Sequence, residues 1–359
     1  MRKILALIAV VTMIFILGAC GSPTEEQPEE QISYEIALVT DAGLIMDGGY
    51  SEVAWNAIST FGAENGLSHK YYKAATATEE AYKATIDDAI AKGAKIVIAD
   101  GYTFEDVIYD VQSEYKDVKF LIIDAEPIDE KTGETKIGEN TCAAMFSSEE
   151  AGYLVGFAAV ENGYTQLGFI GEADQPIYKD YGYGFVQGAN AAAANNGITV
   201  NVRYHSCNES DDRAAVTEKA EGWYEDGVEV IFACGNNVEK PIISAAELKD
   251  GKVIGSETDK SGMSDTVMTS AIKAIPAVLD EILHEYARDK FPGGEVKEYD
   301  FSTGSILLDM STSQFVGFNE GDYKAIGKSL KNKNIEVLDN SVGEISDLGL
   351  YNVAISEEK

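Results

Sequence analysis

One pattern of short strands and helices occurs twice in this chain, and the two copies are a nearly constant distance apart. The stretch IALVTD begins at residue 36 and its counterpart LGFIGE at 167, an offset of 131 residues. VIADG and IFACG are 134 residues apart (97 and 231), and LIIDA and VIGSE are 132 apart (121 and 253). β-Branched runs that alternate with amphipathic helices are typical of parallel sheets built from βαβ units. The sequence therefore predicts an α/β fold with two similar doubly wound, Rossmann-like lobes, joined by a hinge.

The helices repeat as well as the strands. The apolar face over 82–90 ends at Gly93 and that over 216–223 at Gly227, and these glycines are again 134 residues apart. The predicted strands are 34–40, 69–73, 95–100 and 119–124 in the first half, and 166–171, 199–205, 228–234 and 252–256 in the second.

Later segments complete the predicted domain organisation. Residues 265–273 and a helix near 275–290 are expected to cross back between the lobes, and 300–318 to supply a late pair of strands. Three segments then cross the hinge. Ligands of doubly wound sheets bind beyond the carboxyl ends of the strands, so the facing ends should line one cleft. The expected parts are a signal peptide (1–19), a lipidated cysteine and flexible stalk (20–31), an N-terminal lobe (32–146 plus about 274–297) and a C-terminal lobe (147–273 plus about 298–359).

The N-terminus has the features of an export signal. Arg2 and Lys3 precede an apolar run over 4–17, which at 14 residues is shorter than the roughly 20 that a membrane-spanning helix needs. The following Leu-Gly-Ala-Cys resembles the lipobox of bacterial lipoproteins, which implies a diacylglycerol on Cys20. Residues 21–31 are acidic, contain proline and lack apolar side chains, as expected of a flexible stalk. A retained membrane anchor and a signal peptide with an incidental cysteine are the alternatives.

Charge and cysteine content exclude several classes of partner. The formal net charge of −33 argues against nucleic acid and anionic lipid surfaces, because both need clustered positive charge. Cys142, Cys207 and Cys234 are widely spaced and form no CxxC or Cys/His cluster, so we expect buried thiols and no metal, cofactor or disulfide framework.

Motifs of catalysis are weak in this sequence. GYGFVQG (182–188) is one residue off the dinucleotide fingerprint and is interpreted as a loop that opens a helix running to Asn196. No P-loop, GxSxG or HExxH motif occurs. The strongest enzymatic alternative is VTDAGLIMDGG (39–49), which resembles calcium-dependent nucleoside hydrolases, although Asp41 and Asp47 lack the dense aspartate cluster of those enzymes. The histidines are interpreted as structural: His69, His205 and His284.

A series of short motifs resembles one family. IALVTDAGLIMDGGYSEVAW, FLIIDA, SEEAGYLVGFAA, GFIGE, YGYGFVQG, VIFACG, VIGSETDKS, MTSAIK and FPGG occur in the order of the landmarks of the basic membrane protein family, between about residues 34 and 310. The resemblance implies a lipid-anchored substrate-binding receptor of an ABC transporter, with the type I periplasmic-binding-protein fold and a purine nucleoside as the expected ligand.

The resemblance also implies site residues. Tyr50 and Tyr181 fall where the family places base-stacking aromatics, with tyrosine in place of the usual phenylalanine. Glu257 stands where the family has an aspartate that accepts the ribose hydroxyls, and Lys273 matches its lysine partner, so a carboxylate–ammonium pair across the cleft is expected. The alternatives are exposed loop tyrosines and an ordinary salt bridge.

Residues at predicted strand ends are further candidates. Asp41 and Asp124 end strands, while Gly101 and Gly235 follow them, so all four should face the cleft; otherwise they are helix caps and turn residues. Ser51 stands where the family has an asparagine that binds the base.

A hydroxyl cannot replace the paired donor and acceptor of an amide, which leaves the identity of the base open. Asn236, with Asn237 beside it, is the expected substitute for that lost amide.

These observations lead to one expected function. The chain should be a non-enzymatic, lipid-anchored receptor at the extracytoplasmic face of the cell membrane, which closes on a nucleoside-like solute and presents it to an ABC permease. A receptor for a sugar or signalling molecule, and less favoured a surface nucleoside hydrolase, remain as alternatives.

Overall fold

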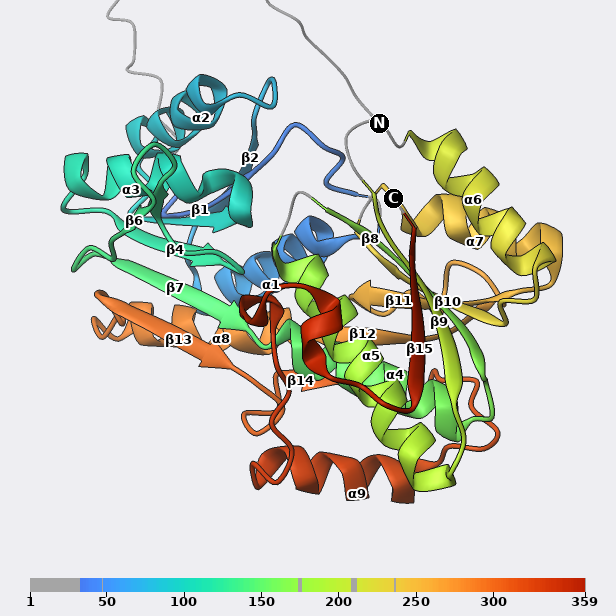
Figure 1. Ribbon diagram of the computed structural model, residues 1–359. Helices are drawn as coiled ribbons and strands as arrows, with labels where there is room; N and C mark the ends of the chain where they lie inside the picture. Colours follow the sequence, from blue (N-terminus) through green and yellow to red (C-terminus); the bar gives the residue numbers. More distant parts are fainter. Residues whose placement is uncertain (1–32, 47, 174–175, 208–211, 236, 359) are drawn as a thin grey trace, which may run out of the picture. The chain divides into compact units, whose positions relative to one another are not determined.

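The computed structural model describes residues 33–46, 48–173, 176–207, 212–235 and 237–358. The expected signal peptide, Cys20 with its stalk, and Asn236 lie outside the described residues. From residue 33 onward the chain forms one compact unit, and its described part contains two sheets of mainly parallel strands (Figure 1).

The first sheet belongs to what we call the first lobe. Its strand order is β13-β7-β4-β3-β1-β2, and neighbouring strands are parallel. The elements of this lobe are β1 (Ile36–Thr40), α1 (Tyr50–Asn65), β2 (His69–Lys73), α2 (Glu79–Ala91), β3 (Ile96–Asp100), η1 (Tyr102–Phe104), α3 (Glu105–Glu114), β4 (Lys119–Ile123), the hairpin of β5 (Ile128–Asp129) and β6 (Glu134–Thr135), β7 (Thr141–Phe146), α8 (Ile275–Ala287) and β13 (Glu295–Tyr299).

The second sheet belongs to the second lobe. Its order is β14-β12-β11-β10-β8-β9-β15, and within it β14 is antiparallel to β12. The elements of this lobe are α4 (Ser148–Glu161), β8 (Gln166–Glu172), α5 (Pro176–Asn196), β9 (Val200–Cys207), α6 (Arg213–Glu225), β10 (Val230–Cys234), α7 (Glu239–Lys249), β11 (Lys252–Glu257), β12 (Val267–Lys273), β14 (Ile306–Leu307), α9 (Glu320–Lys331), η2 (Asn340–Val342), η3 (Ile345–Leu348) and β15 (Val353–Glu358).

The two sheets confirm the duplication read from the sequence. Strands β7-β4-β3-β1-β2 of the first sheet stand in the same order as β12-β11-β10-β8-β9 of the second. The three aligned sequence pairs correspond to β1 and β8, β3 and β10, and β4 and β11. Gly93 and Gly227 follow α2 and α6 with φ of 98° and 95°, a left-handed conformation that glycine adopts without strain.

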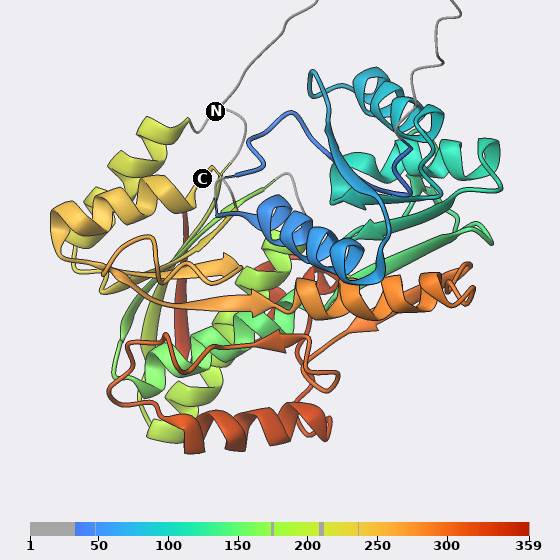
Figure 2. The ribbon, with the colours of Figure 1, turned by 180° about the vertical axis from the view of Figure 1, so that it is seen from behind.

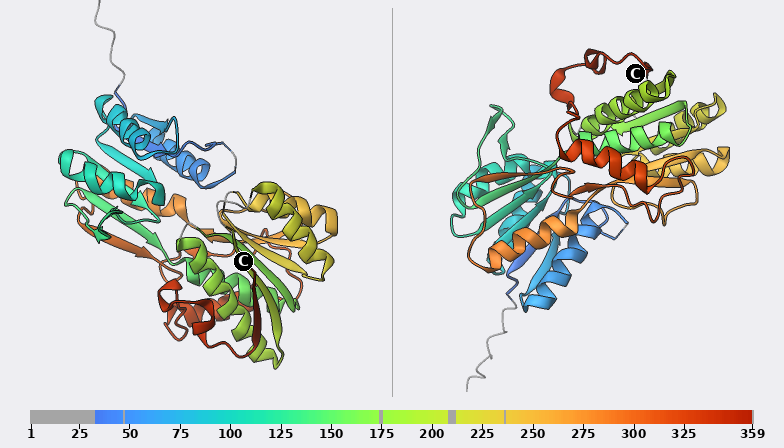
Figure 3. Two further views of the ribbon diagram at one scale, coloured as in Figure 1. Left: turned by 45° about the horizontal axis from the view of Figure 1, so that its top comes forward. Right: turned by 90° about the horizontal axis from the view of Figure 1, so that it is seen from below.

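Helices cover both faces of each sheet, as the near-continuous apolar strands require. Side chains alternate along β1: Ile36 and Leu38 pack with α1 and α8, whereas Ala37 and Val39 pack with α2 and α3. Figure 2 shows α1 and α8 side by side under the first sheet. In the second lobe α4 and α5 cover one face, and α6 and α7 the other (Figure 3).

Three connections join the lobes within the described residues. The chain passes from β7 to α4, returns from β12 to α8, and leaves again from β13 to β14. A continuous apolar cluster, which includes Phe146 of the first lobe and Leu308 of the second, extends across these passages.

Some sequence predictions were incomplete or wrong. Strands β7, β13 and β15 and the short hairpin of β5 and β6 were missed, and residues 300–318 contain β14 alone, in place of the predicted pair. The segment of β7, TCAAMF, has few strong strand formers, so its pairing with β4 decides its conformation. The carboxyl-terminal strand closes the sheet edge beside β9 through Val353 to Glu358.

The interpretation of GYGFVQG as a loop was also wrong. These residues are helical within α5, and glycines 184 and 188 share a face with the i, i+4 spacing. A Cβ on either glycine, or on Gly152 or Gly156 of α4, would overlap backbone atoms of the opposite helix. The glycine motif therefore allows close helix packing and belongs to the core. Among the described residues, no helix combines the length and apolar character needed to cross a bilayer.

Candidate functional site

A cavity of about 320 Å³ lies between the carboxyl ends of the strands of the two lobes. The first lobe contributes the segments after β1, β3 and β4, and the second the ends of β8 and β11 and the starts of α5, α6 and α7. The sequence-predicted residues on its wall are Asp41, Tyr50, Ser51, Gly101, Asp124, Asn237 and Glu257. Within the described residues, no group of three or more histidine, cysteine, aspartate or glutamate side chains is arranged to hold a metal ion.

Two carboxylates are held in an unusual backbone conformation at this wall. Asp124 directly follows β4 and Glu257 ends β11, the equivalent strand of the second lobe. Their φ angles are 57° and 64°, a left-handed region that non-glycine residues rarely occupy. Such strain is found preferentially at functional sites, where the surrounding structure enforces it.

Asp124 and Lys273 form a buried ion pair between the lobes. Lys273 Nζ donates to Asp124 Oδ2 at 2.8 Å, and the two side chains are 0% and 3% exposed. Asp124 Oδ1 has no hydrogen-bond partner. The sequence paired Lys273 with Glu257 instead, and this prediction was wrong. The error has a geometric cause, because the side chain of Lys273 at the end of β12 reaches across to the first lobe.

Burial makes two carboxyls of the cavity, those of Asp100 and Glu257, easier to protonate. Burial, with smaller contributions from the charges of Asp41 and Asp124, raises the pKa of Asp100 to about 7, although a hydrogen bond from Ser51 opposes the rise. Burial likewise raises the pKa of Glu257 to about 7, against the opposing charge of Lys273.

Tyr50 is the first residue of α1 and was predicted on the loop before it. Its side chain is 7% exposed, and its hydroxyl has no hydrogen-bond partner. Burial and the charges of Asp124, Asp100 and Glu257 raise the pKa of this phenol well above its ordinary value. The hydroxyl therefore stays protonated and can act as a hydrogen-bond donor.

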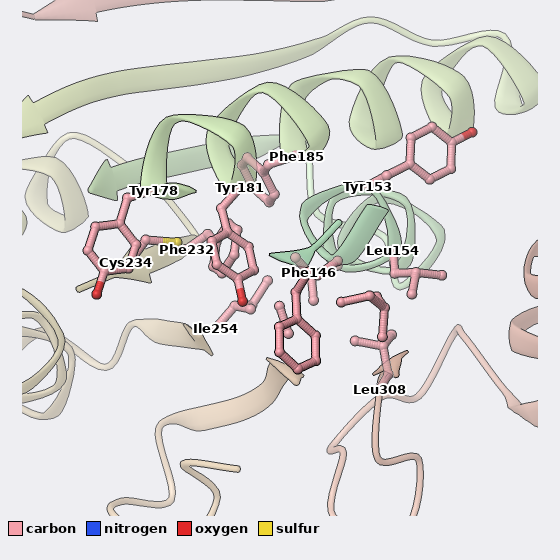
Figure 4. Close-up of a cluster of buried hydrophobic side chains, with 14 of the residues drawn as sticks. Phe146, Tyr153, Leu154, Tyr178, Tyr181, Phe185, Phe232, Cys234, Ile254 and Leu308 are labelled. Carbon is pink, nitrogen blue, oxygen red and sulfur yellow. The ribbon is translucent and has the colours of Figure 1, made fainter. Parts of the chain in front are cut away.

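Tyr181 lies behind the cavity wall. It was predicted on a loop, but it belongs to α5 and is fully buried, with its ring 5.8 Å from that of Phe232. Lys273 Nζ lies 5.1 Å from the Tyr181 ring centroid, which places the aromatic face next to the interlobe ion pair. Figure 4 shows Tyr178 and Tyr181 one turn apart on α5, and of these two it is Tyr178 that reaches the cavity.

The two strand-following glycines behave differently. Gly101 has φ 91° and lines the cavity. Gly235 has φ 121°, but the side chain of Glu172 covers it and it is not on the wall. Glu172 Oε1 also accepts a hydrogen bond from the backbone N–H of Asn237, at 2.7 Å. Gly235 was therefore wrongly expected to face the cleft, because a neighbouring strand supplies the surface there.

A second set of contacts, from Thr258 and Lys260 to Gly48, also joins the two lobes. Thr258 Oγ1 and Lys260 Nζ lie 3.3 and 3.4 Å from the carbonyl oxygen of Gly48, to which both donate. Lys260 is itself buried and pairs with Glu239 at 3.1 Å. These contacts and the Asp124–Lys273 pair join the two lobes directly.

Several wall residues were missed from the sequence. Asp100 could have been found, because it ends a predicted strand immediately before Gly101. Other wall residues lie on helices, and the sequence does not show which face of a helix is turned toward the cavity. The remaining missed residues with polar side chains are Tyr102, Thr103, Glu172, Tyr178, Arg213 and Lys240.

Comparisons with known proteins agree with this architecture. The family model for "ABC transporter substrate-binding protein PnrA-like" matches residues 35–341. The ABC transporter nucleoside-binding protein BmpA of Lactococcus lactis subsp. cremoris is 24% identical over 341 residues, covering 87% of this chain and 93% of that protein. Basic membrane protein A1 of Borrelia garinii is 27% identical over 312 residues, covering 85% and 87%. A solute-binding protein of an ABC transporter system from Aeropyrum pernix K1 has the same fold, with a TM-score of 0.67, 16% identity and coverage of 84% and 87%.

Proposed function

Because the chain belongs to the PnrA-like family of ABC transporter substrate-binding proteins, we propose that it captures a nucleoside outside the cytoplasmic membrane and delivers it to an ABC permease. The cavity between the lobes carries this proposal. Its volume of about 320 Å³ is at the small end of ligand sites, which suits one nucleoside. The nucleoside-binding relative from Lactococcus lactis, which aligns over most of both chains, supports the choice of solute.

The carboxyl groups at the strand ends suit the sugar of such a ligand. In the proposed complex Asp124 and Glu257 accept hydrogen bonds from the ribose hydroxyls, and Lys273 holds Asp124 in place. The unpartnered Oδ1 of Asp124 and hydroxyl of Tyr50 are polar atoms that a bound ligand can satisfy.

Aromatic side chains are available for the base. We propose that Tyr50 from the first lobe and Tyr178 from the second flank it, while Tyr181 supports the ion pair from behind. Asp41, Ser51 and the Gly101 backbone line the same cavity; the proposed role is capture and release without chemistry on the solute.

A thermal-shift screen tests the proposed ligand. The purified protein is heated with nucleosides, free bases or pentoses, and a ligand at a hundred times its Kd should add about 2.7 kcal/mol of stability. Nucleosides should raise the Tm, and Glu257→Gln should reduce the shift while Glu298→Gln on the exposed surface of β13 leaves it unchanged. A pentose that stabilises as well as a nucleoside would identify a sugar receptor, and no shift from any of the three classes would refute the proposed ligand.

Membrane attachment is a separate proposal. We propose that Cys20, outside the described residues, carries the lipid that tethers the receptor to the outer face of the cell membrane. Cys20→Ser should move the protein from the membrane fraction to the medium or periplasm, and unchanged fractionation of this variant would contradict the lipid anchor.

A further inference from the structure

Asp100 is a cavity carboxyl without a cationic partner in the described part of the chain. It ends β3 and lies on the cavity wall. The charges that act on it most strongly are those of Asp41 and Asp124, both of the same sign, and burial with these neighbours raises its pKa to about 7. A buried carboxylate is costly unless hydrogen-bond donors compensate it, so this group requires donors from elsewhere.

Ser51 supplies one of these donors, and its only hydroxyl hydrogen is used in that hydrogen bond. Its Oγ donates to Asp100 Oδ2. A hydroxyl has a single hydrogen, so Ser51 can offer a ligand only its lone pairs. The ionised carboxylate also offers lone pairs alone, on Oδ1 and on the rest of Oδ2. Together the two side chains form a section of cavity wall that accepts hydrogen bonds and donates none.

Two unpartnered atoms independently indicate that a ligand completes this region. The hydroxyl of Tyr50 and Oδ1 of Asp124 belong to residues that are 7% and 4% exposed, and neither atom has a hydrogen-bond partner. Both residues line the same cavity as Asp100. Buried polar atoms are normally hydrogen-bonded in folded proteins, so a ligand with polar atoms at these positions is expected.

Building on the proposed function, we propose that Asp100, positioned by Ser51, selects the base of the bound nucleoside by accepting two adjacent N–H donors. Guanine offers such an edge, with a ring N–H beside an exocyclic amine. Hypoxanthine offers the ring N–H alone. Adenine places a ring-nitrogen lone pair next to its amine, and that lone pair would face the carboxylate. Sites built around a particular hydrogen-bond pattern discriminate strongly against analogues that leave a polar group unpaired.

Isothermal titration of the purified protein with guanosine, inosine and adenosine at pH 8 tests the selection. Guanosine should bind at least tenfold more tightly than inosine or adenosine. Asp100→Asn places a donor in the acceptor wall, so it should weaken guanosine binding at least tenfold and adenosine binding less, or not at all. Asp110→Asn, the same change at an exposed position of α3, is the matched control and should leave all three affinities unchanged.

The results separate this inference from the proposed function. Binding of the three nucleosides with equal affinity, or an equal loss for all three in Asp100→Asn, would overturn the selection by Asp100 and leave the nucleoside receptor intact. Binding of none of them would overturn both. A circular dichroism melt of each variant, compared with the unmodified protein, shows that a lost affinity does not arise from unfolding.

Discussion

Replacing Lys273 by methionine tests the buried pair that joins the lobes. Methionine keeps an unbranched side chain of similar length, so the change removes the ammonium and leaves the packing volume nearly intact. The carboxylate of Asp124 then remains 3% exposed, with no ion-pair partner and with Oδ1 already unpaired. Removing one partner of a buried pair typically costs about 3–5 kcal/mol, because the remaining charge stays out of water.

The magnitude can be read from equilibrium unfolding in urea at pH 8 without ligand. Lys273→Met should lower the free energy of unfolding by about 3–5 kcal/mol, which for a domain of this size lowers the Tm by roughly 4–7 °C. The double variant Lys273→Met/Asp124→Asn removes both charges and should recover at least half of the loss. Lys324→Met is the matched control at a lysine that is 72% exposed, and it should change stability by less than about 0.5 kcal/mol.

Two results would refute this reasoning. A loss no greater than that of Lys324→Met would mean that the interlobe pair does not stabilise the fold. A double variant as unstable as Lys273→Met alone would mean that the unpaired charge of Asp124 is not the source of the loss.

Three further changes test other parts of the structure. Burial raises the pKa of Asp100 to about 7, so the folded state holds an extra proton between about pH 4 and 7 and loses stability as pH rises through that range. In urea titrations of the protein without ligand, Asp100→Asn should therefore raise the free energy of unfolding at pH 8 but not at pH 5. An equal effect at both pH values would contradict the raised pKa. The new methyl group in Gly184→Ala would overlap the Glu149 carbonyl and should lower the free energy of unfolding by about 1–3 kcal/mol or more. Gly222→Ala in α6 has open space around its methyl group and should raise that free energy by up to about 1 kcal/mol. Thermal melts that show similar effects for the two variants would exclude close packing of α4 and α5. Thr258→Val removes a hydroxyl donor between the lobes. Because one hydrogen bond contributes about 0.5–1.5 kcal/mol, nucleoside release should become roughly 2- to 12-fold faster in stopped-flow dissociation. An unchanged release rate would show that this contact does not hold the two lobes together around the ligand.

The ion-pair assignment illustrates how the sequence and the structure differ as sources of information. The sequence placed Glu257 at the tip of a strand and named Lys273 as a site residue, and in the structure β11 ends at Glu257 and β12 at Lys273. It could not decide which carboxylate the lysine meets, because Asp124 is 149 positions away along the chain and reaches Lys273 only through the arrangement of the lobes.

Tyr181 and the glycine motif show the same division within one helix. The pattern YGYGFVQG contains aromatic and glycine residues that local rules assign to loops. The glycines are helical because α4 packs so closely that only hydrogen fits between the backbones, and this packing turns Tyr181 into the core and Tyr178 toward the cavity.

The sequence by itself determined the duplicated α/β architecture. Its signals are apolar periodicity and glycines that end helices, which involve only residues close together in the chain, and they recur at a nearly constant offset. It also placed Asp41, Asp124 and Glu257 at strand ends, where parallel sheets bring side chains together. Only the tertiary structure decided which of these groups meet, which tyrosine reaches the cavity and which carboxyl lacks a cation. Those relations join residues that are distant in the chain, and their energies depend on burial and on separations of a few ångströms, which local sequence patterns do not encode.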